Sequence, residues 1–400
     1  MIAAFYWSIG LEFDQPGRDH THRPDAMQES NIVFGGWPCK NLNRMFSIDK
    51  FLLLIFLSFS AAANDAFEVL RDDASGFAEV LPGKTLTFPA DHAAHTDYRI
   101  EWWYLTANLL DDQGQHWGLQ WTLFRQALST EATKPGWSNN QLWMAHAAIT
   151  TPEGHAFEER FARGGIGQAG VKTDGHFQAW IDDWSWIAES DSLFPARLTF
   201  AVAGKKIVMQ LDSNASWILQ GDNGYSQKSQ QGQASYYYSQ PEIRINGRID
   251  GRQLSGVAWL DREWSSQPLA ENQRGWDWFS LHLDDGNKLM LYRLRHDHGD
   301  HWLSGSWVAA NGEQIHLDSD AIELSEQSFR AIKTGEKTRL TLPLDWQVTL
   351  PDLNRRLRIR PLYDQQWMAA RFPYWEGVVL VEDDNGRKIG KGYMELTGYE

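Results

Sequence analysis

A hairpin pattern that occurs twice constrains the fold of this 400-residue chain. The first copy covers residues 102–125 and the second covers residues 276–293. Each copy has an aromatic-rich segment, a turn that begins Asp-Asp and ends in Gly, and a second segment that ends with an aromatic residue and Arg. Asp and Gly between alternating apolar runs are a strong signal for a β-hairpin. Two copies about half a chain apart indicate two related β domains.

The ends of the two halves match as well. Residues 250–261 and 385–395 each begin with Asx-Gly-Arg, continue through a Gly-containing segment and finish with an acidic residue. An up-and-down barrel places its closing strand beside its opening strand, which removes both sheet edges. We therefore predict two β-barrels in tandem, with the boundary in the polar stretch 265–274. A small barrel of about eight strands can hold one small ligand.

Short strands separated by Asn-Gly and Asp-Gly turns fill the chain after Phe67, which is typical of all-β sandwiches and barrels. One short helix is expected at residues 318–329. The expected strands are residues 99–110, 117–125, 143–150, 196–202, 207–211, 242–249, 257–260, 288–294, 302–308, 340–342, 346–350, 357–361 and 377–381.

The segment before the β region has the pattern of a signal peptide. Lys50 precedes the apolar run 51–60, and an Ala-rich cleavage signal follows at 61–63. The run is too short for an ordinary transmembrane helix, so we expect no stable membrane span in the mature protein. An alternative is a cytoplasmic tail with a short membrane anchor. The expected organisation is an extension from a wrongly chosen start codon at 1–44, a signal peptide at 45–63, and periplasmic or secreted β domains at 64–266 and 267–400.

Composition excludes some classes of function. The formal net charge of -15, with no basic stretch, argues against nucleic-acid binding because the phosphate backbone would repel the protein. Cys39 is the only cysteine, so no disulfide framework or thiolate metal site is expected. The 21 tryptophans fit large aromatic cores as well as aromatic-lined cavities, and the two interpretations are compatible.

The densest polar cluster lies at residues 91–104, just before and within the first hairpin. His92 and His95, with Asp91 and Glu101, could bind a metal ion, but their spacing is not the helical His-x-x-x-His of zinc hydrolases. We favour histidines hydrogen-bonded at a barrel mouth, and we expect neither a metal nor a cofactor. Glu101 beside two tryptophans is either an outward-facing residue or an acid in an apolar wall, where its pKa would rise.

A second cluster lies at residues 259–264. Asp261 and Glu263 are two apart on a strand and therefore face the same side, while Arg262 points the other way. Like charges close together raise the pKa of one of the two acids. The alternative is an exposed charged strand end with surface ion pairs.

Other candidates are weaker. His146 on an apolar strand is more often a satisfied core residue, and Glu376 and Glu395 are further acids beside aromatic residues. No Gly-x-Ser-x-Gly motif, P-loop or dinucleotide fingerprint is present, so no motif supports a serine hydrolase.

Residues 88–92, 101–104, 259–264, 275–279 and 392–399 resemble the AttH/CrtC-like family. Its members include secreted bacterial proteins labelled predicted hydrolases, and carotenoid 1,2-hydratases. The resemblance spans residues 88–400 and implies two lipocalin-like, calycin-type antiparallel β-barrel domains. It also implies a hydrophobic, lipid- or isoprenoid-like ligand.

Two functions remain open at this point. One is an enzyme that adds water to an isoprenoid-like double bond, with Asp261, Glu263 or Glu101 as the proton donor. The other is a non-catalytic periplasmic carrier or chaperone for a lipid-like ligand. A hydrolase that acts on carbohydrate has the poorest support, and the oligomeric state is open. The candidate ligand-binding residues are Asp91, His92, His95, Trp102, Trp103, Tyr104, Trp259, Trp264, Trp276, Trp278 and Tyr292.

Overall fold

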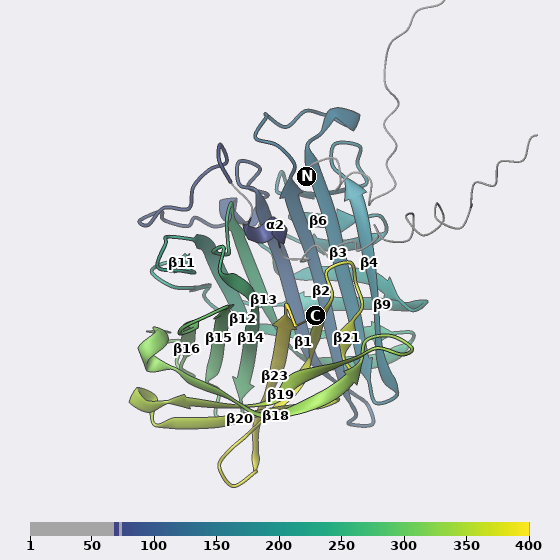
Figure 1. Cartoon of the computed structure of the whole chain (residues 1–400). Coiled ribbons are helices and arrows are strands. Elements are labelled where there is room, and N and C mark those ends of the chain that lie inside the picture. The colour runs from purple at the N-terminus through teal and green to yellow at the C-terminus, as the bar shows by residue number, and fades with distance from the viewer. Residues whose placement is uncertain (1–67, 72–73, 400) are drawn as a thin grey trace, which may run out of the picture. The chain divides into compact units, whose positions relative to one another are not determined.

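The computed structural model describes residues 68–71 and 74–399. The predicted extension at 1–44 and the signal peptide at 45–63 lie outside the described residues. These described residues form one compact unit, built almost entirely of β-strands (Figure 1). The helices are α2 (Glu68–Arg71), η2 (Ala90–His92), η3 (Gly136–Ser138), η4 (Ser319–Ala321) and η5 (Pro351–Leu353).

The first half of this unit is one antiparallel sheet with the strand order β4-β3-β2-β1-β13-β12-β9-β8-β7-β6-β5. Two short strands, β10 and β11, pair with β12 off this path. The strands are β1 (Ile100–Asp111), β2 (His116–Ala127), β3 (Gln141–Thr151), β4 (Gly154–Arg163), β5 (Ala169–Lys172), β6 (Gln178–Ile181), β7 (Trp184–Ala188), β8 (Ala196–Val202), β9 (Lys205–Asp212), β10 (Ile218–Leu219), β11 (Tyr225–Gln227), β12 (Ala234–Ile249) and β13 (Arg252–Ser265).

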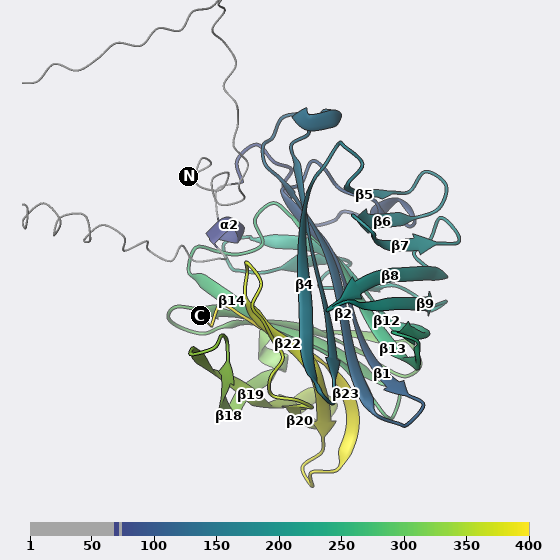
Figure 2. The same ribbon diagram turned by 90° about the vertical axis from the view of Figure 1, so that its right-hand side faces the viewer.

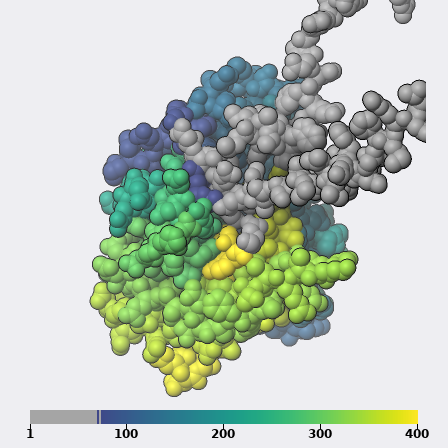
Figure 3. Space-filling model, in the orientation of Figure 1, coloured from purple at the N-terminus to yellow at the C-terminus, as the bar shows by residue number. Residues whose placement is uncertain are grey.

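The second half is another antiparallel sheet, ordered β17-β16-β15-β14-β23-β22-β20-β19-β18, with β21 paired to β22. Figure 3 shows this half, coloured green to yellow, over the lower part of the visible face. The strands are β14 (Gln273–Leu283), β15 (Lys288–His296), β16 (Trp302–Val308), β17 (Gln314–Leu317), β18 (Glu323–Lys333), β19 (Arg339–Leu350), β20 (Arg355–Pro361), β21 (Trp367–Met368), β22 (Tyr374–Glu382) and β23 (Lys388–Thr397).

The opening and closing strands of each half pair as the sequence predicted. Strand β1 pairs with β13, with Tyr104 opposite Asp261, and β14 pairs with β23, with Trp278 opposite Glu395. The barrels are nevertheless not closed by hydrogen bonds. The first sheet ends at β4 and β5, and the second ends at β17 and β18. Each sheet is therefore a curled half-barrel, and the first one brings β3 and β4 against β6 and β8 (Figure 2).

Strands β1 and β14 are buried on both faces. Trp103 and Leu105 of β1 point into the core of the first sheet, whereas Tyr104 packs into a separate cluster between the two sheets. Strand β14 does the same, because Phe279 lies in the second core and Trp278 in the cluster between the sheets. Side chains alternate between the faces of a strand, so each duplicated hairpin supplies one wall of a barrel core and one wall of the interface.

Strands β2, β22 and β23 also approach one another across this interface. A Cβ atom added at Gly118 of β2 would lie 2.7 Å from the Tyr393 hydroxyl and 2.8 Å from Val378 Cγ1. Glycine therefore lets the two sheets pack closely at this point.

The predicted helix at residues 318–329 is wrong. The structure has the single turn η4 followed by strand β18, which pairs with β19 along its length. Burial along β18 follows a period of two, because Leu324 is partly buried, Ile332 is buried, and Phe329 on the other face is 60% exposed. Pairing with β19 and burial of one face outweigh the weak helical pattern in this polar segment.

No helix in the described part of the chain is both long and apolar enough to cross a membrane.

Candidate functional site

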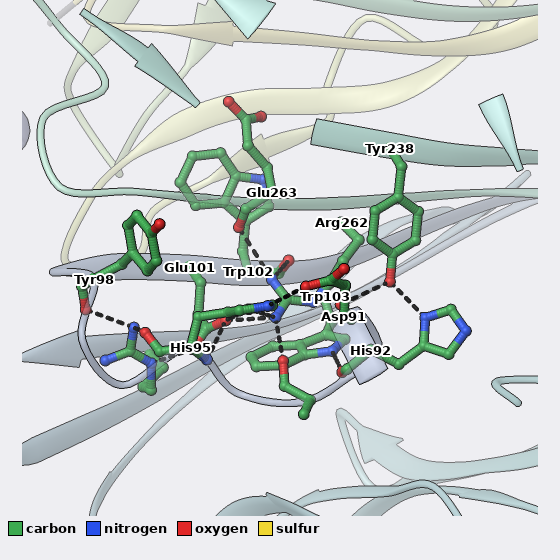
Figure 4. Close-up of polar contacts among 12 residues, drawn as sticks. Asp91, His92, His95, Tyr98, Glu101, Trp102, Trp103, Tyr238, Arg262 and Glu263 are labelled. Atoms are coloured by element: carbon green, nitrogen blue, oxygen red, sulfur yellow. Dashed lines mark hydrogen bonds and ion pairs between the residues drawn. The ribbon is translucent and has the colours of Figure 1, made fainter. Parts of the chain in front are cut away.

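The candidate residues fall into two buried polar groups on opposite faces of strands β1 and β13. The first group lies at the mouth of the first half-barrel, beside the segment 87–98. The second group lies between the two sheets. Figure 4 shows the division on β13, where Arg262 points toward the barrel mouth and Glu263 points the other way, as the sequence predicted.

Glu101 is the centre of the barrel-mouth group and is 0% exposed. Its carboxylate forms ion pairs with Arg125 and Arg262. Burial alone would raise the pKa of Glu101, but these two guanidinium groups hold it well below its usual range. Glu101 therefore stays ionised and is unsuited to donate a proton, although its position in an aromatic wall suggested that role.

His95 links the segment before β1 to the barrel-mouth group. Its backbone N–H donates to Glu101 at 2.9 Å, and its ring stacks on Trp264 with a centroid distance of 3.9 Å. Its Nε2 lies 3.2 Å from Asp91 Oδ1. Arg262 also packs over the ring of Trp103, with its Cζ 3.8 Å from the ring centroid. These contacts act as a structural clamp that holds the segment before β1 against the barrel.

His92 points away from His95, as Figure 4 shows. Its Nδ1 lies 2.6 Å from the Tyr238 hydroxyl, and its ring packs against Phe88 and Trp217. Burial lowers the pKa of His92 to about 3, so the ring is neutral. The two histidines do not converge, and within the described ranges no group of three or more His, Cys, Asp or Glu residues could hold a metal ion.

Asp261 is the centre of the interface group. It is 3% exposed and accepts hydrogen bonds from the Tyr237 hydroxyl at 2.5 Å, the Ser239 hydroxyl at 2.5 Å and Trp259 Nε1 at 2.7 Å. Burial raises the pKa of Asp261 to about 7, against the opposing effect of these hydrogen bonds. No basic side chain in the described part of the chain forms an ion pair with it. The alternative prediction, in which residues 259–264 form an exposed and charged strand end, is therefore wrong.

The donors around Asp261 are oriented by a second layer of residues from both sheets. Trp278 Nε1, which can only donate, lies 3.3 Å from the Tyr237 oxygen. Gln220 donates from Nε2 to the Ser239 hydroxyl at 2.8 Å, and its Oε1 accepts from the Ser306 hydroxyl of the second sheet at 2.6 Å. Both hydroxyl protons are thereby directed at Asp261, whose carboxyl group is held in one orientation.

Glu263 has a different environment from Asp261. Lys228 lies 2.9 Å from it, and the lysine ammonium sits 4.1 Å from the ring centroid of Tyr292. Burial alone would lower the pKa of Lys228, but the charge of Glu263 raises it overall. The charge of Glu263 also contributes to the raised pKa of Asp261, as expected for neighbouring acids. Because Lys228 neutralises Glu263, Asp261 is the better proton donor of the two.

The structure adds a second pair of acids to the interface. Glu376 of β22 and Glu395 of β23 are direct cross-strand partners. The Tyr104 hydroxyl donates to Glu376 Oε1 at 2.5 Å, and Trp276 Nε1 donates to Glu395 Oε1 at 2.6 Å. Burial raises the pKa of Glu395 to about 7, and burial together with the charge of Glu395 raises the pKa of Glu376 well above its usual range.

Sequence reasoning ranked these two acids among the weaker candidates. Their aromatic neighbours, Tyr374 and Tyr393, gave the only signal, because the pairing of β22 with β23 cannot be seen in the sequence. His146 is a core residue, as the sequence predicted, and one of its ring nitrogens has a hydrogen-bond partner: Nδ1 lies 2.8 Å from the Tyr374 hydroxyl.

The predicted ligand-binding residues divide between the two groups. The interface is the more aromatic of the two, with Tyr104 packed edge-on against Trp278 at a centroid distance of 5.2 Å. The residues on the interface side are Trp102, Tyr104, Trp259, Trp276, Trp278 and Tyr292. The residues at the barrel mouth are Asp91, His92, His95, Trp103 and Trp264.

An open cleft of about 950 Å³ lies elsewhere, among the turns of the second sheet. Its walls come from residues 283–285, 349–357 and 383–389, and they carry charges of both signs. None of the buried acids lines this cleft, so the chemistry points to the interface instead.

Comparison with known proteins agrees with this architecture. Residues 79–399 match the model of the AttH-like family. The AttH-like protein NE1406 from Nitrosomonas europaea is 34% identical with a TM-score of 0.71, and the match covers 81% of this chain and 100% of that one. No curated protein sequence matches the chain.

Two more distant structures share the fold. Kievitone hydratase from Nectria haematococca is 14% identical with a TM-score of 0.59, over 82% of this chain and 97% of the hydratase. CghA, solved with Sch210972, is 10% identical with a TM-score of 0.50, over 82% of this chain and 98% of that protein. At these identities the likeness concerns the fold alone.

Proposed function

This chain belongs to the AttH-like family, and we propose that it binds an apolar, isoprenoid-like ligand between its two sheets and adds water to a carbon–carbon double bond of that ligand. The observation that carries the proposal is Asp261. Its pKa is raised to about 7, it has no ion-pair partner within the described ranges, and it lies among aromatic side chains. A general acid works best when its pKa is close to the working pH.

The proposed reaction begins with proton transfer from Asp261 to one alkene carbon. The O–H bond breaks, the π electrons form the new C–H bond, and the positive charge stays on the more substituted carbon. Tyrosine and tryptophan faces attract positive charge, and Trp259, Trp278 and Tyr104 all lie in the interface cluster. Water then forms the C–O bond and releases one proton, so the sum of the reaction is alkene plus water.

The fold shared with kievitone hydratase supports this choice, since that protein is a hydratase by name. At 14% identity the likeness gives no substrate for this chain. The choice of an isoprenoid-like alkene rests on the aromatic side chains of the interface rather than on that relative.

The test is incubation of the purified protein with the acyclic carotenoid lycopene, followed by mass spectrometry of the extract. We expect a product heavier by one water, formed at a rate that falls as the pH rises through the pKa of Asp261, about 7. Asp261→Asn should abolish the product. Asp345→Asn is the matched control, because Asp345 is equally buried but is ion-paired with Arg358, outside the interface cluster.

A carrier or chaperone is the competing function. Lipid that co-purifies with the protein and is never hydrated, by wild type or variants, would favour a carrier and refute the hydratase. Location is a separate part of the proposal, since we expect the protein in the periplasm or outside the cell. The N-terminal sequence of the exported protein should begin near Asn64, and a start near residue 1 would contradict this.

A further inference from the structure

We propose that Glu376 and Glu395 form a second acid–base group of the same site, which binds the attacking water at Glu376 Oε2 and takes its proton at Glu395. The inference rests on the proposed hydration. It assigns a role to the two buried acids of the second sheet, which the choice of Asp261 as proton donor does not use.

The geometry of the two strands brings the carboxyl groups together. Glu376 and Glu395 are directly opposite in the antiparallel pair β22–β23, so their side chains leave the sheet on the same face. Opposed residues of this kind have Cβ atoms about 4.5–5.5 Å apart. Two buried carboxylates at such a distance cannot both be ionised, and the pair therefore shares a proton.

One oxygen of the pair is left for a ligand. Glu376 is 1% exposed, and its Oε1 accepts from Tyr104. Its Oε2 has no hydrogen-bond partner of ordinary geometry among the described residues, because the nearby Tyr374 hydroxyl pairs with His146 Nδ1 at 2.8 Å. A buried polar atom without a partner is costly, and native structures usually fill such a position with water or a ligand group. Both oxygens of Asp261, in contrast, already accept hydrogen bonds from their own sheet, so Asp261 can give up a proton but offers no unpaired oxygen to a water.

The pair faces Asp261 across the interface. Tyr104 lies opposite Asp261 on the first sheet, and its hydroxyl reaches Glu376 on the second. Trp278 lies opposite Glu395 on the second sheet, and its indole N–H reaches Tyr237, which in turn donates to Asp261. Each sheet thus supplies one acidic group, with the rings of Tyr104 and Trp278 between them. A ligand held there would receive its proton from one side and its water from the other.

The proton balance is simple. After Asp261 has protonated the alkene, the water at Glu376 Oε2 donates an electron pair to the cation and forms the C–O bond. Its O–H bond breaks as Glu395, which ionises more readily than Glu376, takes the proton. The proton then returns to Asp261 through solvent, and the number of protons is unchanged over one turnover.

The first experiment follows hydrogen exchange in D₂O with lycopene as the probe. Wild type should give hydrated product that carries deuterium. Glu395→Gln should lower the rate of hydration by on the order of 10²-fold, while recovered lycopene still gains deuterium because Asp261 continues to protonate it reversibly. Asp261→Asn should lose both hydration and exchange. Hydration by Glu376→Gln and Glu395→Gln at the wild-type rate would overturn the inference and leave the role of Asp261 intact.

The second experiment needs no ligand. Infrared spectroscopy of the full chain at about pH 8, one unit above the pKa of Asp261 of about 7, should show the carbonyl stretch of a protonated carboxyl group. Glu376→Gln should remove that band. Glu382→Gln, on the same strand but ion-paired with Arg360, should leave it unchanged.

A band that persists in both Glu376→Gln and Glu395→Gln would show that the pair holds no proton and would overturn the inference. A wild-type protein that never hydrates lycopene would overturn the catalytic role of the pair along with the proposed function. In that case the infrared band would still show whether the proton is shared.

Discussion

Glu101 and Asp261 are both buried acids on the paired strands β1 and β13, yet their environments set opposite protonation states. Two guanidinium groups lie against Glu101, which stays charged and holds the barrel mouth together. Asp261 on the opposite face has three hydrogen-bond donors but no ion-pair partner in the described part of the chain, and burial dominates its pKa. The same residue class therefore serves structure on one face of the strands and, in the proposed reaction, proton transfer on the other.

Asp261 should make the stability of the protein depend on pH. Its pKa is about 7 in the folded state against the ordinary 3.8, so the folded protein binds more protons than the unfolded chain between these values. The free energy of unfolding should therefore fall as the pH rises from about 4 to about 7, by up to about 1.4 kcal/mol per pH unit from this group.

Asp261→Asn should lose this contribution. Urea unfolding at several pH values measures this effect. Relative to Asp261→Asn, the unfolding free energy of the wild type should fall as the pH rises to about 7, and the difference between the two proteins should be constant at higher pH. Parallel curves over the whole range would show that Asp261 is ionised throughout.

Glu101→Gln should lower the free energy of unfolding strongly. The substitution removes no proton donor, because Glu101 is ionised in the folded protein. The substitution leaves the guanidinium groups of Arg125 and Arg262 buried with one charge partner fewer, which costs about 3–5 kcal/mol in such sites. Urea unfolding at neutral pH measures the loss. Glu131→Gln is the control, since Glu131 forms an exposed ion pair with Lys134 that should contribute less than about 1 kcal/mol. Equal unfolding free energies for the two variants would refute the clamp.

At the scale of elements, the sequence predicts the hairpins and the pairing of β1 with β13 and of β14 with β23, because turn residues and alternation are local signals. It does not predict β18, because most residues of this strand are polar and the alternation of apolar and polar residues expected of a strand is weak. The candidate acid Asp261 and its shared face with Glu263 could also be predicted. The pair Glu376–Glu395 and the ion pairs of Glu101 could not, because they depend on contacts between residues far apart in the chain.

The close approach of β2 to the second sheet gives a prediction for Gly118. Gly118→Ala should push against Tyr393 and Val378, which a Cβ atom would meet at 2.7 and 2.8 Å. Overpacking of this kind typically costs about 1–3 kcal/mol in unfolding free energy. Gly335→Ala is the matched control, because Gly335 lies in the exposed loop between β18 and β19 and its Cβ would meet only the hydroxyl of Thr338 at 2.8 Å, an exposed side chain that can rotate away into solvent. If both variants unfold at the same urea concentration, the two sheets are not in tight contact at this point.

At the scale of the whole molecule, the two half-barrels share a third layer of buried residues. The layer contains Tyr104, Tyr237 and Trp259 from the first sheet, and Trp278 and Tyr292 from the second. Hydrogen bonds cross it as well, such as those from Tyr104 to Glu376 and from Ser306 to Gln220. Each half therefore completes the burial of the other, and the proposed site exists only where the two meet.

The shared layer predicts that neither half is stable alone, even though the first sheet ends at Ser265 and the second begins at Gln273. Chains of residues 64–266 and 267–400, expressed separately, would each expose the large aromatic side chains of this layer to water, and burial of one such side chain contributes about 1.5–3 kcal/mol. We expect each half to lack a cooperative thermal transition in calorimetry and an equimolar mixture to regain one. Two halves that each unfold cooperatively at the temperature of the intact protein would show that the layer between the sheets contributes little, and that the acids within it are held in place by their own sheets.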